Sequence, residues 1–144
     1  MKIRAATSND LDAIKTLLVE SDLPSSDVTA ELLNGFFVVQ NEKGVLVGSV
    51  GLERFGHKAL LRSLVVTTAA RDIGLARSSV ACAEDLARES GISELWLLTT
   101  TATEFFRKSR YVAVDRAAVP VEVQASTQFS TLCPSSAACM KKAL

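Results

Sequence analysis

One segment of the chain combines residue types that can bind an anion. A mostly apolar run, Leu60–Thr67, is followed by Arg71-Asp72-Ile73-Gly74-Leu75-Ala76-Arg77, which has the pattern Arg-x-x-Gly-x-Ala. This order predicts a strand, a glycine turn and the start of a helix that runs to about Ser90. The first amides of a helix lack internal partners, and the helix dipole favours negative charge at that end. We therefore predict that this segment binds an anionic group of a ligand.

The charge balance indicates what kind of anion this is. Lys+Arg and Asp+Glu number 16 each, so the chain as a whole has no electrostatic reason to bind nucleic acid. A local basic cluster is large enough for a small phosphorylated ligand and too small for a nucleic-acid surface. Its members are Arg71, Arg77, Arg107, Lys108 and Arg110.

Other familiar sites are missing from the sequence. It contains neither Gly-x-Gly-x-x-Gly after a strand nor a Gly-Lys-Ser/Thr loop, which argues against a dinucleotide oxidoreductase and a P-loop NTPase. His57 is the only histidine and falls in a predicted turn, so a histidine-based metal site or catalytic triad is not expected.

Length and composition are those of one globular domain, residues 1–144. The 48% hydrophobic and 22% charged content argues against extensive disorder, and no apolar run approaches the roughly 20 residues that span a bilayer. The first residues lead into structure without a secretory segment. Cys82, Cys133 and Cys139 do not make a disulfide framework for a chain of this size. We expect a cytoplasmic protein without membrane contact.

Hydrophobic spacing predicts strands that alternate with helices in the order β-α-α-β-β-β-α-β-α-β, followed by a tail. This order favours an α/β (α+β) fold with a mixed sheet and helices on its faces. Two short helices are predicted before the first hairpin: one after caps at Ser8–Asp10, and one capped by Ser26 or Asp27 with a left-handed end near Asn34-Gly35. The predicted strands are Lys2–Thr7, Phe36–Asn41, Val45–Arg54, Ala59–Thr67, Glu94–Thr99, Tyr111–Asp115 and Ala138–Leu144. Besides the helix to Ser90, later helices are predicted at Thr101–Lys108 and, as one or two turns, at Val121–Ser126.

Two motifs in this order resemble those of the GNAT superfamily of N-acetyltransferases. They are Arg71-x-x-Gly74-x-Ala76 after the apolar strand, and Thr101-Ala-Thr-Glu-Phe-Phe-Arg-Lys-Ser-Arg-Tyr111 after the next strand. The element order is similar over nearly the whole chain. The ending from Val119-Pro120 to Cys139-Met140 resembles the small acetyltransferases associated with bacterial arsenic-resistance gene clusters.

The resemblance implies acetyl-CoA as co-substrate, held between two central strands that splay apart. Pantetheine would bind the backbone edge at Leu64 and Val66 or their neighbours, and the pyrophosphate would lie on the amides of Ile73 to Arg77. Gly74 and Ala76 are small where the backbone approaches phosphate. The implied cofactor-binding residues are Leu64, Val65, Val66, Arg71, Asp72, Ile73, Gly74, Leu75, Ala76, Arg77, Thr101, Phe105, Phe106 and Lys108.

The resemblance also implies how the reaction would proceed. Glu53 lies where many relatives have a carboxylate that draws the proton from the attacking amine, and an amide near Val66 would polarise the thioester. Phe106 stands where relatives carry a tyrosine that protonates the departing thiolate. The proton donor to the thiolate would then be water or the hydroxyl of Thr101 or Thr103, or the thiolate leaves without being protonated. Alternatively, Glu53 is a surface carboxylate that pairs with Arg54.

The acceptor is expected to be a primary amine of a small molecule, by resemblance an amino-acid-like compound such as an arsenical or phosphinate. Alternation along Ala59–Val66 places Arg62 opposite Leu61 and Ser63, so Arg62 either holds an acceptor carboxylate or lies on the sheet surface. Asp27 is a candidate for the acceptor wall or a helix cap. The predicted substrate-binding residues are Asp27, Arg62 and Ser63.

Two other functions compete with acetyl transfer. One is a GNAT-fold module that binds acyl-CoA without turnover, and the other is a metalloid binder that uses the thiols of Cys133 and Cys139. Buried, purely structural thiols are the simpler explanation for these cysteines. An apolar tail also predicts a homodimer built around the C-terminal region.

Overall fold

The computed structural model describes residues 1–67, 74–127, 129 and 136–144, and it has the predicted mixed α/β fold. Within these residues seven strands form one sheet in the order β1-β2-β3-β4-β5-β7-β6. The strands are β1 (Lys2–Ala5), β2 (Phe36–Gln40), β3 (Leu46–Phe55), β4 (Lys58–Val66), β5 (Glu94–Thr99), β6 (Val112–Val114) and β7 (Ala138–Ala143). The helices are α1 (Leu11–Glu20), α2 (Leu75–Glu89), α3 (Thr103–Lys108) and α4 (Val121–Gln124), with 3-10 turns η1 (Ser8–Asp10), η2 (Leu32–Gly35) and η4 (Arg116–Ala118). None of these helices is both long and apolar enough to cross a membrane.

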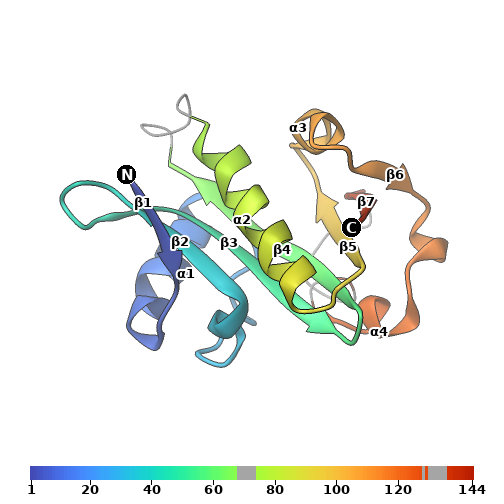
Figure 1. The fold of residues 1–144 in the computed structure, drawn as a ribbon, viewed down its shortest axis with the longest axis horizontal. Coiled ribbons are helices and arrows are strands. Elements are labelled where there is room, and N and C mark those ends of the chain that lie inside the picture. Colours follow the sequence, from blue (N-terminus) through green and yellow to red (C-terminus); the bar gives the residue numbers. More distant parts are fainter. Residues whose placement is uncertain (68–73, 128, 130–135) are drawn as a thin grey trace.

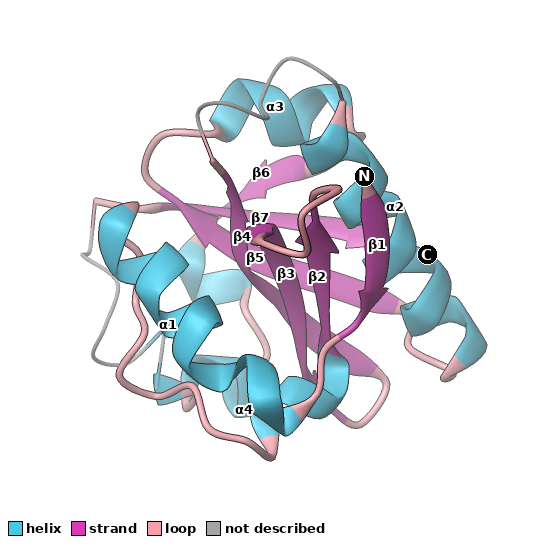
Figure 2. Ribbon diagram, turned by 90° about the vertical axis from the view of Figure 1, so that its left-hand side faces the viewer, coloured by secondary structure: helices cyan, strands magenta, loops and turns pink. Residues whose placement is uncertain are grey.

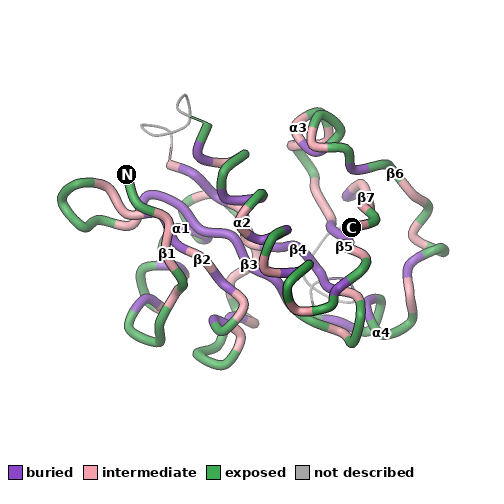
Figure 3. Tube along the Cα trace, viewed as in Figure 1, coloured by how far each residue is buried: buried purple, intermediate pink, exposed green. Residues whose placement is uncertain are grey.

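The sheet lies between two layers of helix, with α1 on one face and α2 on the other (Figure 2). On the α2 face, apolar residues of β3, β4 and β5 pack against Val80, Ala83 and Ala87 of α2. On the α1 face, Phe36 and Val38 of β2 pack against Ile14 and other apolar residues of α1. Figure 3 shows the buried residues concentrated along the central strands, as expected for a sheet covered on both faces.

Strands β4 and β5 separate along their length, which opens the sheet. They pair in parallel only from Lys58↔Glu94 to Leu60↔Trp96, whereas β5 pairs with β7 along its whole length, to Thr99↔Ala138. In Figure 1 the two strands meet near the start of β4 and diverge towards its end. The backbone edge of the second half of β4 therefore faces a gap, as the resemblance predicted.

A β-bulge interrupts β4 within this gap. Ser49↔Val65 and Gly51↔Arg62 are paired, so two residues, Ser63 and Leu64, lie opposite one residue of β3. Ser63 has φ 57°, which is unusual for a residue other than glycine. The predicted alternation from Ala59 to Val66 is therefore wrong beyond Arg62, because an added residue changes which face the following side chains occupy.

The segment between α1 and β2 also differs from its prediction. The predicted short helix does not begin after Ser26 or Asp27; within the described residues only the 3-10 turn η2 (Leu32–Gly35) lies between α1 and β2. Gly35 does not have the left-handed conformation that was expected. A side chain there would instead lie 2.3 Å from the carbonyl oxygen of Leu52, so this position needs glycine for close approach to β3.

Candidate functional site

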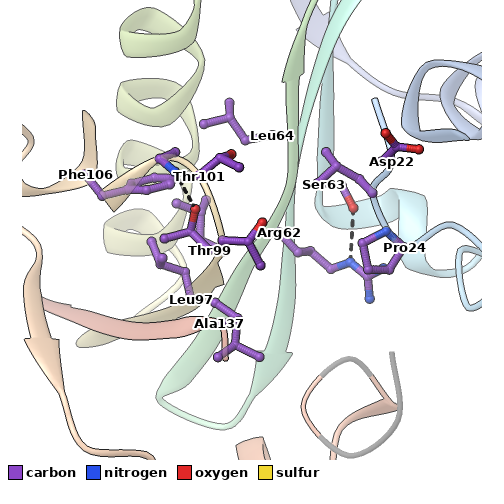
Figure 4. Close-up of a pocket in the computed structure, with 15 residues that line it drawn as sticks. Asp22, Pro24, Arg62, Ser63, Leu64, Leu97, Thr99, Thr101, Phe106 and Ala137 are labelled. Carbon is purple, nitrogen blue, oxygen red and sulfur yellow. Dashed lines mark hydrogen bonds between the residues drawn. The ribbon is translucent and has the colours of Figure 1, made fainter. Parts of the chain in front are cut away.

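A cavity of about 360 Å³ lies where β4 and β5 diverge. Figure 4 shows side chains from β4 and the segment after α1 on one side of it and side chains from β5 and α3 on the other. The β5–α3 side includes Leu97, Thr99, Thr101 and Phe106. The opposite side includes Asp22, Pro24, Arg62 and Ser63, whereas Leu64 of β4 lies on the side of Thr101 and Phe106.

The structure brings three predicted cofactor residues to the cavity: Leu64, Thr101 and Phe106. Phe105 packs edge-on against Phe106, with ring centroids 5.1 Å apart, and contributes to the core on the α2 face. Lys108 is exposed at the last position of α3. Phe105 and Lys108 are not among the residues that line the cavity.

Val65 and Val66 contribute buried side chains to the two faces of the sheet. Val65 packs in the α1-side core, and Val66 packs with Leu75 of α2. Any contact that they make with a ligand would therefore use the backbone rather than the side chains.

Helix α2 begins at the end of the sheet where β4 and β5 are far apart (Figure 1). Gly74 precedes the first residue of the helix and has φ 71°, a left-handed conformation that glycine adopts without strain. Leu75 is buried, Ala76 is half-buried and Arg77 is exposed. Arg71, Asp72 and Ile73, also predicted to bind cofactor, lie outside the described residues.

Arg62, Asp27 and Glu53 form one charge cluster. The Arg62 Nη1 and Nη2 atoms donate to the two carboxylate oxygens of Asp27 at 2.5 and 2.6 Å, and Nη1 also donates to Glu53 Oε1 at 3.0 Å. Arg62 is only 3% exposed although it lines the cavity. The structure therefore brings together the predicted base and two predicted substrate residues, from β3, β4 and the segment after α1.

Burial and pairing act in opposite directions in this cluster. Burial disfavours the charged form of Asp27, but the hydrogen bonds and charge of Arg62 outweigh it, so the pKa of Asp27 is lowered. Burial likewise opposes the charge on Arg62, and Asp27 and Glu53 outweigh it, so the pKa of Arg62 is raised. Pairing therefore favours the charged forms of Asp27 and Arg62 despite their burial.

Two serines fix the bulge beside this cluster. Ser63 Oγ accepts a hydrogen bond from Arg62 Nε at 3.1 Å, and the buried Ser49 donates its hydroxyl proton to the Ser63 carbonyl at 2.7 Å. The strained φ of Ser63 is thus held by side chains on both strands. Ser63, predicted to bind substrate, lies on the cavity wall.

Glu53, the predicted base, takes part in the Arg62 ion cluster and is not a surface carboxylate paired with its neighbour. Glu53 pairs with Arg62 rather than Arg54, which instead donates to the carbonyls of Gly56 and Ser90, so the alternative pairing is wrong. Glu53 borders a second cavity of about 320 Å³ and contacts the first cavity only through Arg62.

Hydroxyl groups on the β5 side are the available proton donors near Phe106. Thr99 Oγ1 accepts the Ala102 amide at 3.0 Å, so its own proton is directed elsewhere. Thr101 lines the cavity and Thr103 does not. The one tyrosine, Tyr111, donates its hydroxyl proton to Glu84 at 2.9 Å, and burial raises its pKa.

Sequence reasoning missed Asp22 and Thr99, which both line the cavity. Asp22 lies two residues after the end of α1 and has φ 57°, and its amide donates a hydrogen bond to the Val19 carbonyl. The Asp22-Leu23-Pro24 sequence marks a helix end, but nothing in it indicates that this turn faces β4.

The thiols do not form a metal site within the described residues, where no group of three or more ligating side chains occurs. Cys139 is buried beside Trp96 and Leu60, and burial raises its pKa to about 11. A protonated thiol is a poor ligand for a metal ion. Cys133, the other thiol of this hypothesis, lies outside the described residues.

Comparison with known proteins identifies a family whose model matches this chain. The family model described as "Acetyltransferase (GNAT) family" matches residues 9–110. A search of curated proteins found no match.

Three solved structures with coenzyme A are similar in fold. N-acetylglutamate synthase from Neisseria gonorrhoeae, complexed with coenzyme A and N-acetyl-glutamate, is 22% identical with a TM-score of 0.86 over 99% of this chain and 35% of that chain. Rv2747 from Mycobacterium tuberculosis, complexed with CoA and NLQ, is 21% identical with a TM-score of 0.80 over 100% and 99%. The PaiA N-acetyltransferase from Thermoplasma acidophilum, complexed with coenzyme A, is 16% identical with a TM-score of 0.71 over 99% and 98%.

The chain spans about a third of the Neisseria protein and nearly the full length of the other two. At these identities the solved structures establish the fold, whereas the family model covers most of the sequence. This chain belongs to the GNAT family of acetyltransferases.

Proposed function

We propose that the protein transfers the acetyl group of acetyl-CoA to the primary amine of a small molecule. The observation that carries this proposal is the cavity between the diverging β4 and β5, in a chain of the GNAT family. In the reaction the amine nitrogen bonds to the acetyl carbon and the carbon–sulfur bond breaks. The amine loses a proton and the thiolate gains one.

The open half of β4 would hold the pantetheine arm of acetyl-CoA. Pantetheine carries amides that can pair with a strand edge, and the parallel pairing of β4 with β5 stops at Leu60. Leu64 and Val66 would supply backbone groups, and the side chains of Leu64 and Phe106 would add apolar surface.

The start of α2 would hold the pyrophosphate. The first amides of a helix lack partners within the helix, and with the helix dipole they favour an anion at its start; the exposed Arg77 adds positive charge. Arg71, Asp72 and Ile73 precede this turn in sequence and stay predicted contacts.

For the base we retain Glu53. Its carboxylate shares Arg62 with Asp27, so a proton from the amine would reach it along the cavity wall or through water. For the thiolate, Thr101 or water is the expected proton source, because Phe106 has no proton to give and Tyr111 is bound to Glu84.

Acetyl-CoA consumption with a panel of amines tests the proposal. Amine-dependent release of free CoA supports it. Glu53→Gln is expected to lower kcat by at least about 100-fold with little change in the KM for acetyl-CoA, as for loss of a general base. Glu20→Gln, an exposed carboxylate at the end of α1, is the matched control. Unchanged kcat in Glu53→Gln would remove the base assignment.

A binding module without turnover is the second candidate, and Phe106 on the cavity wall favours it. Calorimetry would detect CoA binding to such a module, but acetyl-CoA would not be converted to free CoA in the presence of any amine. The two functions are therefore separated by turnover and not by binding.

The arsenic-resistance resemblance predicts an amino-acid-like acceptor, and the N-acetyl-glutamate bound to the Neisseria relative is an amino-acid product of this kind. The carboxylate of such an acceptor needs a cation, for which Arg62 is the candidate on the cavity wall. The C-terminal homodimer stays a prediction, which light scattering tests.

A further inference from the structure

The charged residues that line the cavity affect which kind of amine can bind in it. Asp22 and Arg62 are the charged residues that line it in the described part of the chain. Asp22 is exposed, whereas Arg62 is buried. An acceptor therefore meets an accessible carboxylate and a guanidinium that already has partners.

All three guanidinium nitrogens of Arg62 donate hydrogen bonds within the protein. Nη1 and Nη2 bind Asp27, Nη1 also binds Glu53, and Nε binds Ser63 Oγ. The pairing with Asp27 is bidentate, the geometry that an acceptor carboxylate would itself need. An acceptor carboxylate that bound Arg62 in this bidentate way would have to displace Asp27.

That displacement is unfavourable because Asp27 would lose its main partner while mostly shielded from water. Its side chain is 12% exposed, and the ionised form is maintained by Arg62. A buried charge without its partner is strongly destabilised. Lys15 of α1 also acts on the charge of Asp27, but it does not line the cavity and cannot replace Arg62 there.

The cluster also carries an excess of negative charge. Asp27, Glu53 and the cavity-lining Asp22 are three carboxylates, against the two cations Arg62 and Lys15. In a partly enclosed site such an excess attracts cations and repels anions.

We propose that the acceptor is a cationic amine without a carboxylate, such as a diamine, and that Asp22 binds its second ammonium group. This inference rests on the proposed acetyl transfer and narrows its acceptor. It departs from the amino-acid-like acceptor because Arg62, the cation among the described lining residues, is occupied by the protein's own carboxylates.

Two matched pairs of acceptors test the inference, since each pair differs by one carboxylate: putrescine with ornithine, and cadaverine with lysine. CoA release measured over a range of each acceptor gives kcat/KM. We expect the diamine to exceed its amino acid by at least about tenfold, which corresponds to about 1.4 kcal/mol. Equal values, or a preference for the amino acid, overturn the inference and leave acetyl transfer standing.

A variant identifies the residue responsible. Asp22→Asn is expected to lower kcat/KM for putrescine about tenfold and to leave n-butylamine, which has no second ammonium, unchanged. Asp12→Asn, exposed on α1, is the matched control. An equal loss with both acceptors would overturn the role of Asp22 in binding the second ammonium. Absence of CoA release with every amine would instead refute the proposed function.

Discussion

Asp27 and Arg62 form a bidentate ion pair, 2.5 and 2.6 Å long, that ties the segment after α1 to the bulged strand β4. These residues are 35 positions apart in the sequence. Arg62 lines the cavity and Asp27 holds it in place from behind, so the pair connects the stability of the fold to the shape of the site.

Asp27→Asn should lower the free energy of unfolding by about 3 kcal/mol, because it leaves the buried Arg62 with one carboxylate partner. Urea denaturation measures this value. Asp12→Asn should change it by less than about 0.5 kcal/mol, as a surface substitution does. If the two variants were equally stable, the pair would have no structural role.

The stability contributed by Asp10 should depend on pH. The hydrogen bond from Arg4 lowers the pKa of Asp10 from 3.8 to about 2. A lowered pKa in the folded state means that the stabilisation is fully present above pH 3.8 and is lost as the pH falls towards 2.

Asp10→Asn should therefore cost about 1–2 kcal/mol at neutral pH, a value reduced for the partial exposure of Arg4. Thermal unfolding of both proteins measures the difference, which should shrink below about pH 3. A difference that does not change with pH would contradict this account.

Tyr111→Phe should leave kcat for acetyl transfer within about twofold. The Tyr111 hydroxyl binds Glu84, which also accepts from Lys142 at 2.9 Å, and the ring packs edge-on against Phe106. Only the hydrogen bond is removed, at a cost of about 1 kcal/mol in stability. A large fall in kcat would instead identify Tyr111 as the proton donor to the thiolate.

Gly74→Ala should weaken CoA binding, whereas Gly44→Ala should not. Both glycines have positive φ, 71° and 78°, and open space where a side chain would lie. Each substitution should therefore cost about 1 kcal/mol of stability through backbone strain.

Only Gly74 precedes the helix that is proposed to hold the pyrophosphate. Calorimetric titration with CoA is the measurement, and we expect at least about a tenfold weaker Kd for the Gly74 variant alone. Equal affinities would place the pyrophosphate elsewhere.

Local sequence patterns were enough to predict the mixed α/β fold and most of its strands and helices, apart from the helix expected before β2. The strand predicted at Glu94–Thr99 is observed with those bounds, because a buried strand with covered faces has a continuous apolar run. Glycines such as Gly74 can be placed from sequence because few other residues tolerate positive φ.

The contacts of the acceptor wall depended on tertiary structure. The sequence predicted three separate site residues, Asp27, Glu53 and Arg62. Their ion cluster joins three segments that are distant in sequence, so no local sequence pattern indicates it. The bulge at Ser63 depends on pairing with β3, and Asp22 reaches the cavity only because α1 packs beside β4. Spacing along a chain determines local conformation, whereas partners distant in sequence are determined by how the layers pack.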